Sequence, residues 1–336
     1  MKHITILIPG GKTNINSMAC IIGAYEILTA ANDYWVRNGK QPLYEIEMAG
    51  LSPRAELMKG LLTLKTEKNI SAIQKTDLIL IPSLNHKEDE NDKESQAMLD
   101  WINTHYRKGA EIASMCSAAF VLAAAGLLDG KKCATHWCFA DAFQKKFPKV
   151  NLQVEQLITD EHRIYTNGGG YSFLNLVIYL VEKYYDRQTA IYCSKIFQIE
   201  IDRQSQSAFI IFAGQKHHSD EMVKKAQAYI ESNLEDKISM EALSSRFAIG
   251  RRNFDRRFIK ATGNTPVEYT QRVKIEFAKK EFETTRKTIN EIMYAVGYSD
   301  TKAFREVFRK ITGISPLEYR GKYNKEAAIR AQLNLL

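Results

Sequence analysis

The chain has 336 residues, 45% of them hydrophobic and 26% charged, which is a globular composition and too much chain for one ordinary core, so we expect two or three domains. No apolar run approaches the ~20 residues of a membrane span, and the chain start lacks a signal-peptide pattern, so we expect a cytoplasmic protein with no membrane partner. From Lys216 onward lie 24 of the 47 Lys and Arg but only 16 of the 39 Asp and Glu residues, so this last third holds the whole net charge of +8 and is expected to bind a polyanion.

The first half of the chain alternates short apolar strands with helical segments. The strands read "HITILIPG" from His3, "YEIEMAGL" from Tyr44, "DLILIPS" from Asp77, "EIASM" from Glu111 and "RIYTNGGG" from Arg163. This alternation predicts an α/β, flavodoxin-like parallel sheet with helices on both faces. Sites in such sheets lie at the carboxyl ends of strands, so the candidate loops are 9–13, 83–86, 116–117 and 167–170.

The stretch "EIASMCSAAFVLAAAGLLDG" from Glu111 places a single cysteine on the turn from a strand into a helix. Backbone N–H groups and a helix N-terminus at such an elbow stabilise a thiolate and an oxyanion. Cys116 is therefore a candidate nucleophile, and also a candidate pocket residue that senses a ligand or an oxidant.

The same stretch resembles the ThiJ/PfpI superfamily, and the longer run "CSAAFVLAAAGLLDGKKCATHW" is similar to the GlxA-like regulators, in which this domain is fused to an AraC-type domain. The resemblance covers residues 3–190 and implies a homodimer. The chain departs from the enzymes of the superfamily. Ser114 and Ala118 replace the elbow glycines, Ser117 stands where protease-like members have histidine, and Cys20 stands where enzymes carry a carboxylate.

Without an acid or base partner a thiol is a poor general catalyst, so we predict a sensor pocket and no enzyme activity. The alternative is a cysteine-dependent enzyme of the isonitrile-hydratase or amidase type that carries a DNA-binding tail, and a third reading is an oxidation sensor. The pocket candidates are Cys116, Ser117, His136, Cys20 and Gly169. His136 is expected to be a hydrogen-bonding pocket residue rather than a base.

Two weaker signals each also have an ordinary structural explanation. Asn85 and His86 would touch a ligand or belong to an ordinary loop, and Gly168–170 would admit a small molecule or merely give a flexible entry to the next helix.

The five cysteines are odd in number and irregular in spacing, which argues against disulfides. Cys133, His136 and Cys138 lack further ligands at zinc spacing, so no metal or cofactor is expected.

The last third contains an internal repeat. The segment from Ile238, "ISMEALSSRFAIGRRNFDRRFIKATGNTPVEY", aligns without gaps with that from Thr288, "TINEIMYAVGYSDTKAFREVFRKITGISPLEY", at an offset of 50 residues. Each copy reads as a helix, a tight turn and a second helix that ends at a glycine. We predict two helix-turn-helix units, 238–262 and 288–312.

The second helix of each copy has one buried and one exposed face. Phe254 and Phe258, like Phe304 and Phe308, are four residues apart and share the buried face. Positions two residues from Phe254 lie about 200° around the helix, which exposes Arg252 and Arg256. The segment 265–285 between the copies is helical in period, and at ~1.5 Å per residue its ~30 Å is close to one turn of DNA.

Residues 218–321 resemble the AraC/XylS-type DNA-binding domain, in which two such units are joined by a long helix and each ends in a "TG…P.EY" tail. The resemblance implies contacts to base edges from the exposed second helices. The predicted DNA-binding residues are Arg251, Arg252, Asp255, Arg256, Thr301, Lys302, Arg305 and Glu306. Glu306 departs from the basic residue common in relatives: a carboxylate accepts from cytosine N4 but repels phosphate, so the second unit either reads a different base or binds weakly.

These observations predict an α/β domain over 1–195, a linker over 196–217 with some apolar content, an all-α double helix-turn-helix domain over 218–321 and a tail over 322–336. We expect a transcription regulator whose first domain senses an amine- or amide-like metabolite or dimerises. Its expected partners are promoter DNA, an unidentified small effector and a second copy of the chain, with RNA polymerase as a further candidate.

Overall fold

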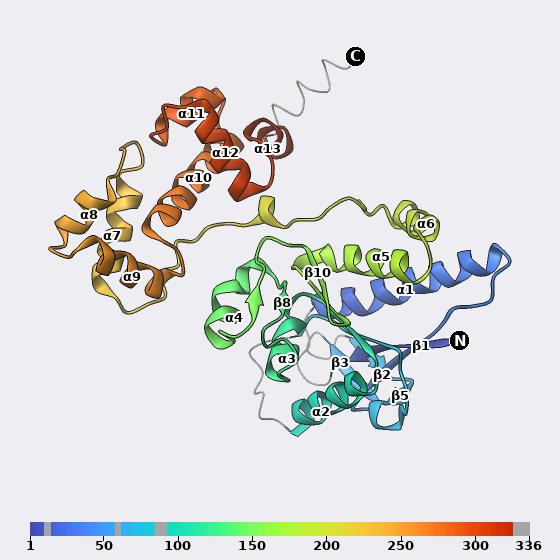
Figure 1. Cartoon of the computed structure of the whole chain (residues 1–336). Coiled ribbons are helices and arrows are strands. Elements are labelled where there is room, and N and C mark those ends of the chain that lie inside the picture. The colour runs from blue at the N-terminus through green and yellow to red at the C-terminus, as the bar shows by residue number, and fades with distance from the viewer. Residues whose placement is uncertain (10–14, 58–61, 85–92, 325–336) are drawn as a thin grey trace, which may run out of the picture. The chain divides into compact units, whose positions relative to one another are not determined.

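The computed structural model describes residues 1–9, 15–57, 62–84 and 93–324. Most of the candidate loop 9–13, both Asn85 and His86, and the tail from residue 325 therefore lie outside the described residues. The chain divides into two compact units, Met1–Gln206 and Ser207–Leu336, and each is described by itself (Figure 1).

The first unit is built on a seven-stranded sheet in the order β10-β11-β7-β6-β1-β2-β5. Neighbouring strands are parallel except β10, which is antiparallel to β11. The strands are β1 Lys2–Ile8, β2 Tyr44–Gly50, β5 Lys68–Asn69, β6 Leu78–Ile81, β7 Glu111–Ser114, β10 Ile158–Glu161 and β11 Ile164–Asn167. Two small ladders pair β3 (Arg54–Leu57) with β4 (Leu62–Lys65) and β8 (Lys132–Cys133) with β9 (Asn151–Leu152).

Helices cover both faces of this sheet, because successive side chains of a buried strand point to opposite sides. Along β1, Ile4, Ile6 and Ile8 belong to one core and Leu7 to the other. The first core takes in α1 (Ile15–Arg37), α5 (Phe173–Tyr184) and α6 (Arg187–Phe197), and the second takes in α2 (Lys93–Arg107), α3 (Ala119–Ala124) and α4 (Ala140–Lys146). The predicted parallel sheet with helices on both faces is confirmed.

The second unit is helical, as predicted. Its helices are α7 Glu221–Ser232, α8 Met240–Arg246, α9 Arg251–Thr262, α10 Pro266–Thr284, α11 Ile289–Ala295, α12 Thr301–Thr312 and α13 Pro316–Tyr323. The pairs α8–α9 and α11–α12 are the two repeat copies, and α10 runs between them (Figure 1). Phe254 and Phe258 are fully buried in one core, Phe304 and Phe308 in the other, because each pair lies on the inward face of its helix.

The connecting segment 196–217 is divided between the two units. Residues up to Gln206 belong to the first unit and those from Ser207 to the second. Residues 208–216, which we call the strap, are bonded to helices of the second unit, for example by the hydroxyl of Tyr269, which donates to the carbonyl of Gly214 at 3.1 Å. Apolar residues such as Phe212, which packs against Tyr269 at 5.4 Å between ring centroids, explain why this segment is not a free tether.

Candidate functional site

The exposed face of α9 presents two arginines with few partners. Gly250 caps the helix, Phe254 and Phe258 turn inward, and Arg252 and Arg256 are exposed. Arg256 donates to the side-chain oxygen of Asn253 at 3.0 Å. The sequence prediction did not include Asn253, although its position three residues before Arg256 places the two side chains on the same exposed face.

Arg251 and Asp255 are held differently from these arginines. The Arg251 Nε donates to both carboxylate oxygens of Asp255, at 2.8 and 2.9 Å, and its Nη1 donates to Glu241 of α8 at 2.6 Å. Charged hydrogen bonds of this kind fix a guanidinium in one orientation. Arg251 therefore links α9 to α8 in addition to facing the surface.

The exposed face of α12 carries the remaining predicted DNA-binding residues. Asp300 caps this helix, and its side chain accepts from the backbone N–H groups of Lys302 and Ala303 at 2.7 and 3.2 Å. Thr301 follows the cap, and Lys302, Arg305 and Glu306 are exposed. Among the described residues, none forms an ion pair with Lys302, Arg305 or Glu306, so their charges stay available to a ligand.

Cys116 sits on the predicted elbow at the end of β7. Its φ is +56°, a left-handed conformation that residues other than glycine seldom adopt. Its backbone N–H donates to the side-chain oxygen of Asn167 at 3.3 Å, and its carbonyl accepts from the Thr135 hydroxyl at 3.0 Å. These bonds hold the strained turn, and the residue is only 3% exposed.

Ser117 is anchored to the loop that follows β6. Its hydroxyl pairs with that of Ser83 at 3.0 Å, donates to the carbonyl of Leu84 and accepts from the Leu84 N–H at 3.1 Å. The structure therefore joins two of the predicted strand-end loops, 83–86 and 116–117, at this serine.

Cys20 of α1 is buried, and burial, together with the nearby Cys116, raises its pKa to about 12. A neutral thiol at this position supplies neither the charge nor the basicity of a carboxylate. Cys138 also has a raised pKa, because it is partly desolvated and Cys116 lies near it. The environment thus keeps both neighbouring thiols protonated at neutral pH.

His136 is half-buried, and burial lowers its pKa. Its Nδ1 accepts from the backbone N–H of Cys138 at 3.1 Å. A Cβ at Gly169 would lie 1.6 Å from the His136 ring, so Gly169 serves the close packing of that ring; its φ of −92° is open to any residue. Within the described part of the chain, no hydrogen bond joins His136 to Cys116.

A closed path of hydrogen bonds links the elbow to the last residue of the first unit. From Thr135, which bonds Cys116, the path continues as the Gln206 amide donates to the Thr135 carbonyl at 2.9 Å, and its oxygen accepts from Gly169 N–H at 3.4 Å. Ser172 bridges the carbonyl of Gly169 and the amide of Asn167, at 2.8 and 2.9 Å. Gln206 is 2% exposed, and no periodicity in the sequence signalled its role.

The described residues contain neither a metal-binding cluster nor a membrane-spanning helix. No group of three or more His, Cys, Asp or Glu side chains is placed to hold a metal ion. Nor does any described helix combine the length and apolarity that crossing a bilayer demands.

Two family models match the chain, one in each unit. Residues 43–182 match the DJ-1/PfpI family, and residues 243–322 match a helix-turn-helix domain. The chain joins a DJ-1/PfpI domain to an AraC-type helix-turn-helix domain. This two-domain organisation confirms the resemblance seen in the sequence.

Curated relatives match the chain over more residues than either unit contains. The HTH-type transcriptional regulator GbdR of Pseudomonas aeruginosa is 27% identical over 223 residues, which cover 66% of this chain and 60% of that protein. The HTH-type transcriptional regulator GlxA of Rhizobium meliloti is 27% identical over 215 residues, 62% of this chain and 65% of that protein. The chain thus matches about 60% of the length of GbdR.

Among solved structures, a Vibrio parahaemolyticus protein described as a transcriptional regulator superposes with a TM-score of 0.51 at 25% identity. The match covers 58% of this chain and 98% of that one. It supports the α/β fold of the DJ-1/PfpI domain.

Proposed function

We propose that the chain is a sequence-specific DNA-binding transcription regulator, with residues 218–321 as its DNA-binding domain and promoter DNA as its partner. The observation that carries this proposal is the pair of exposed recognition faces. Arg252 and Arg256 on α9, and Lys302 and Arg305 on α12, point away from buried phenylalanine pairs. The names of the relatives, HTH-type transcriptional regulators, support it.

The proposed contacts follow from donor and acceptor chemistry. An arginine fork matches the O6 and N7 acceptors of guanine, and a carboxylate accepts from cytosine N4. Arg252, Arg256 and Arg305 would read guanines, Glu306 would read a cytosine, and Thr301 and Lys302 would hold bases or phosphates at the start of α12. Arg251 and Asp255 would meet DNA as the ion pair they already form.

Selection of duplexes from a randomised library by the full chain tests this function. We expect an enriched sequence with two separate conserved segments, and an affinity that falls steeply with salt because lysine and arginine release phosphate counterions. Binding without sequence preference, or none at all, would overturn the proposal.

The DJ-1/PfpI domain is proposed to sense a small amine- or amide-like effector, to mediate homodimerisation, or both, in a cytoplasmic protein that would also meet RNA polymerase. Sensing is supported by the path of hydrogen bonds that starts at Cys116 and reaches Gln206, directly before the second unit begins. Replacement of Gln206 by leucine should leave the DNA affinity of the effector-free chain intact. It should remove the change in that affinity when effector is added. Sedimentation of the full chain tests the dimer.

Cys116 is proposed to be part of the sensor and not a nucleophile. The support is its neighbour Cys20, a neutral thiol where the superfamily enzymes have a carboxylate, and the absence of a bond to His136 among the described residues. Its elbow conformation is what favours the enzyme alternative. Peptide-resolved alkylation against pH separates the two: a reactive Cys116, with amide or isonitrile turnover lost in Cys116→Ser, would establish an enzyme.

A further inference from the structure

Two lysines of α10 are buried, which is unusual for an ammonium group. Lys274 is 6% exposed and Lys279 is 4% exposed. Taking a charge out of water is costly unless it gains partners; burial lowers the pKa of Lys274 accordingly. Lys274 finds its partners outside α10, whereas Lys279 has one partner in the strap, Ile210, and one on α10 itself, Glu276.

Lys274 lies where the segment that leads into the first copy meets the turn inside the second copy. Its Nζ donates to the carbonyl of Asp236, just before α8, at 2.9 Å, and lies 5.7 Å from the ring centroid of Tyr298, between α11 and α12. A Cβ on Gly297 would come within 2.8 Å of the same Nζ and 2.5 Å of the Glu235 carbonyl. The segment that leads into the first copy thus abuts the turn of the second copy at this ammonium group.

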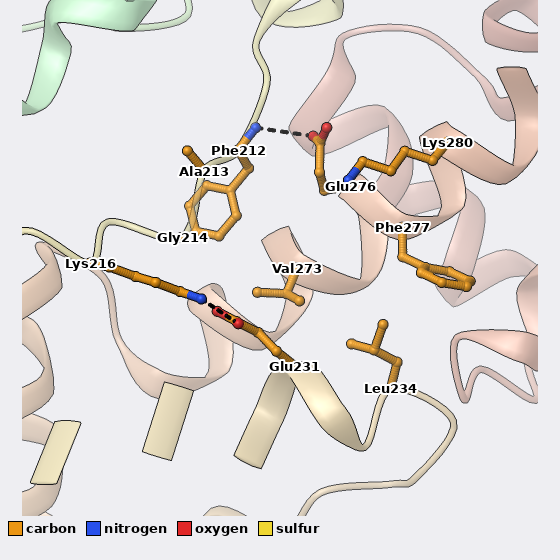
Figure 2. Close-up of a pocket in the computed structure, with 10 residues that line it drawn as sticks. All are labelled: Phe212, Ala213, Gly214, Lys216, Glu231, Leu234, Val273, Glu276, Phe277 and Lys280. Carbon is orange, nitrogen blue, oxygen red and sulfur yellow. Dashed lines mark hydrogen bonds and ion pairs between the residues drawn. The ribbon is translucent and has the colours of Figure 1, made fainter. Parts of the chain in front are cut away.

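Lys279 fastens the strap to α10. Its Nζ donates to the carbonyl of Ile210 at 2.5 Å and pairs with Glu276 at 2.7 Å. Glu276 also accepts from the backbone N–H of Phe212 at 3.1 Å, as Figure 2 shows. The ammonium lies 5.9 Å from the ring centroid of Tyr319 of α13, in the second copy's core.

The strap that Lys279 holds reaches helices that share a core with each copy, α13 with the second and α7 with the first. At one end the Tyr323 hydroxyl donates to the carbonyl of Ala208 at 3.2 Å. At the other, the carbonyl of Gly214 accepts from the Gln227 amide of α7 at 2.8 Å, and Lys216 pairs with Glu231 at 2.6 Å (Figure 2). A cavity of about 340 Å³ remains between the strap, α7 and α10, so these polar bonds, together with the packing of Phe212 on Tyr269, hold the strap here.

We propose that Lys274 and Lys279 are positioning residues that hold the two helix-turn-helix copies at one separation, so that the chain reads two base segments at a single spacing. The proposal rests on the proposed DNA binding. One added base pair moves a half-site by ~3.4 Å along the duplex and, at ~10.5 base pairs per turn, rotates it by roughly 34°. Two helix-turn-helix copies held rigidly cannot both keep contact with their base segments after such a shift, whereas two loosely joined copies can.

The test uses the full chain and the duplex enriched from a randomised library by the wild type. Three derivatives are compared: one with one base pair inserted between the conserved segments, one with two, and one with the segment read by α12 scrambled. For the wild type we expect each insertion to cost at least about tenfold in affinity, because the second contact gains from linkage only when geometry permits both.

Lys274→Met should weaken binding to the parent duplex by about tenfold and shrink the insertion penalty to less than about threefold, since the second reader is no longer held in register. Its affinity for the scrambled duplex should equal that of the wild type, because one copy alone is undamaged. Lys279→Met should act in the same direction. Lys280→Met is the matched control: it removes an equal charge from an exposed position of the same helix and should keep the wild-type insertion penalty.

An unchanged insertion penalty in Lys274→Met, or an equal loss on the scrambled duplex, would overturn the proposal, as would a wild type that tolerates insertions. Should both methionine variants misfold by circular dichroism, Tyr298→Leu provides the same comparison with both lysines in place, and must also reduce the penalty. A wild type that enriches no sequence contradicts DNA binding itself, which separates the two failures.

Discussion

The two helix-turn-helix copies share a skeleton and use one equivalent residue for different purposes. Glu241 and Glu291 occupy the same repeat position. In the second copy Glu291 accepts from the backbone N–H of Thr288 at 2.6 Å and completes a capping box for α11. In the first copy the cap moves one position along, to Ser239, and Glu241 instead binds Arg251 of the recognition helix at 2.6 Å.

The difference shows that the two copies keep similar cores while their exposed helix faces differ. The buried phenylalanines and the closing tyrosines, Tyr269 and Tyr319, are retained in both copies because they form the cores. The recognition surfaces diverge: the first has an arginine locked by two carboxylates, and the second has charges without ion-pair partners among the described residues.

The largest expected effect comes from breaking the shared skeleton. Phe258→Ala and Phe308→Ala each empty a fully buried site and should destabilise the second unit by ~3–5 kcal/mol. Because α10 and the strap join the copies, we expect both variants to lower the denaturant midpoint of the whole unit. Faster amide exchange confined to the altered copy would show instead that the copies unfold independently.

The next effect distinguishes the two recognition surfaces. Arg256→Ala and Arg305→Ala should each weaken specific binding by ~1–3 kcal/mol and relax base preference at different positions of the selected sequence. Competition binding with single-base variants of that sequence measures this. The control is Ile259→Ala, at an exposed apolar position of α9; relaxed preference at one common position in both arginine variants would contradict the assignment.

A smaller effect separates the two caps. Thr288→Ala removes only the hydroxyl arm of the capping box, because alanine keeps the backbone N–H that donates to Glu291 at 2.6 Å. Ser239→Ala should cost more, about 1 kcal/mol of local helix stability, because the Ser239 hydroxyl, which accepts from the Ala242 N–H at 3.3 Å, has no second arm beside it. Amide exchange in the first turns of α11 and α8 measures the difference, and equal effects would show that the box adds nothing.

The smallest expected effect appears in acid. The Thr288 N–H lowers the pKa of Glu291, so its capping bond contributes stability that is complete above the ordinary carboxyl pKa of about 4.3 and is lost as pH falls through the lowered value. The first turn of α11 should therefore exchange faster below about pH 4. Glu291→Gln should remove this pH dependence, and its persistence would assign the effect to another carboxyl.

Periodicity explains what could be predicted from the sequence and what could not. The offset of 50 residues and the spacing of Phe254 and Phe258 define the helix-turn-helix copies because burial repeats every three to four residues. Apolar strand runs define the sheet and place Cys116 at the carboxyl end of one of its strands.

Residues that act through polar bonds over long sequence distances leave no such pattern. Lys274 and Lys279 look like ordinary surface lysines of a charged helix, yet each donates to a backbone carbonyl far along the chain, 38 and 69 residues away. Gln206 bonds Thr135 from 71 residues away, in a segment whose composition is that of a linker.

The strap also sets where the chain can be divided. A fragment that starts at residue 218, where the resemblance to AraC/XylS-type domains begins, would leave Lys279 buried without the Ile210 carbonyl and Tyr269 without that of Gly214. A fragment that starts at Ser207 would keep the strap and its hydrogen bonds. To produce the second unit alone, or to fuse it to another domain, the chain is best divided directly after Gln206.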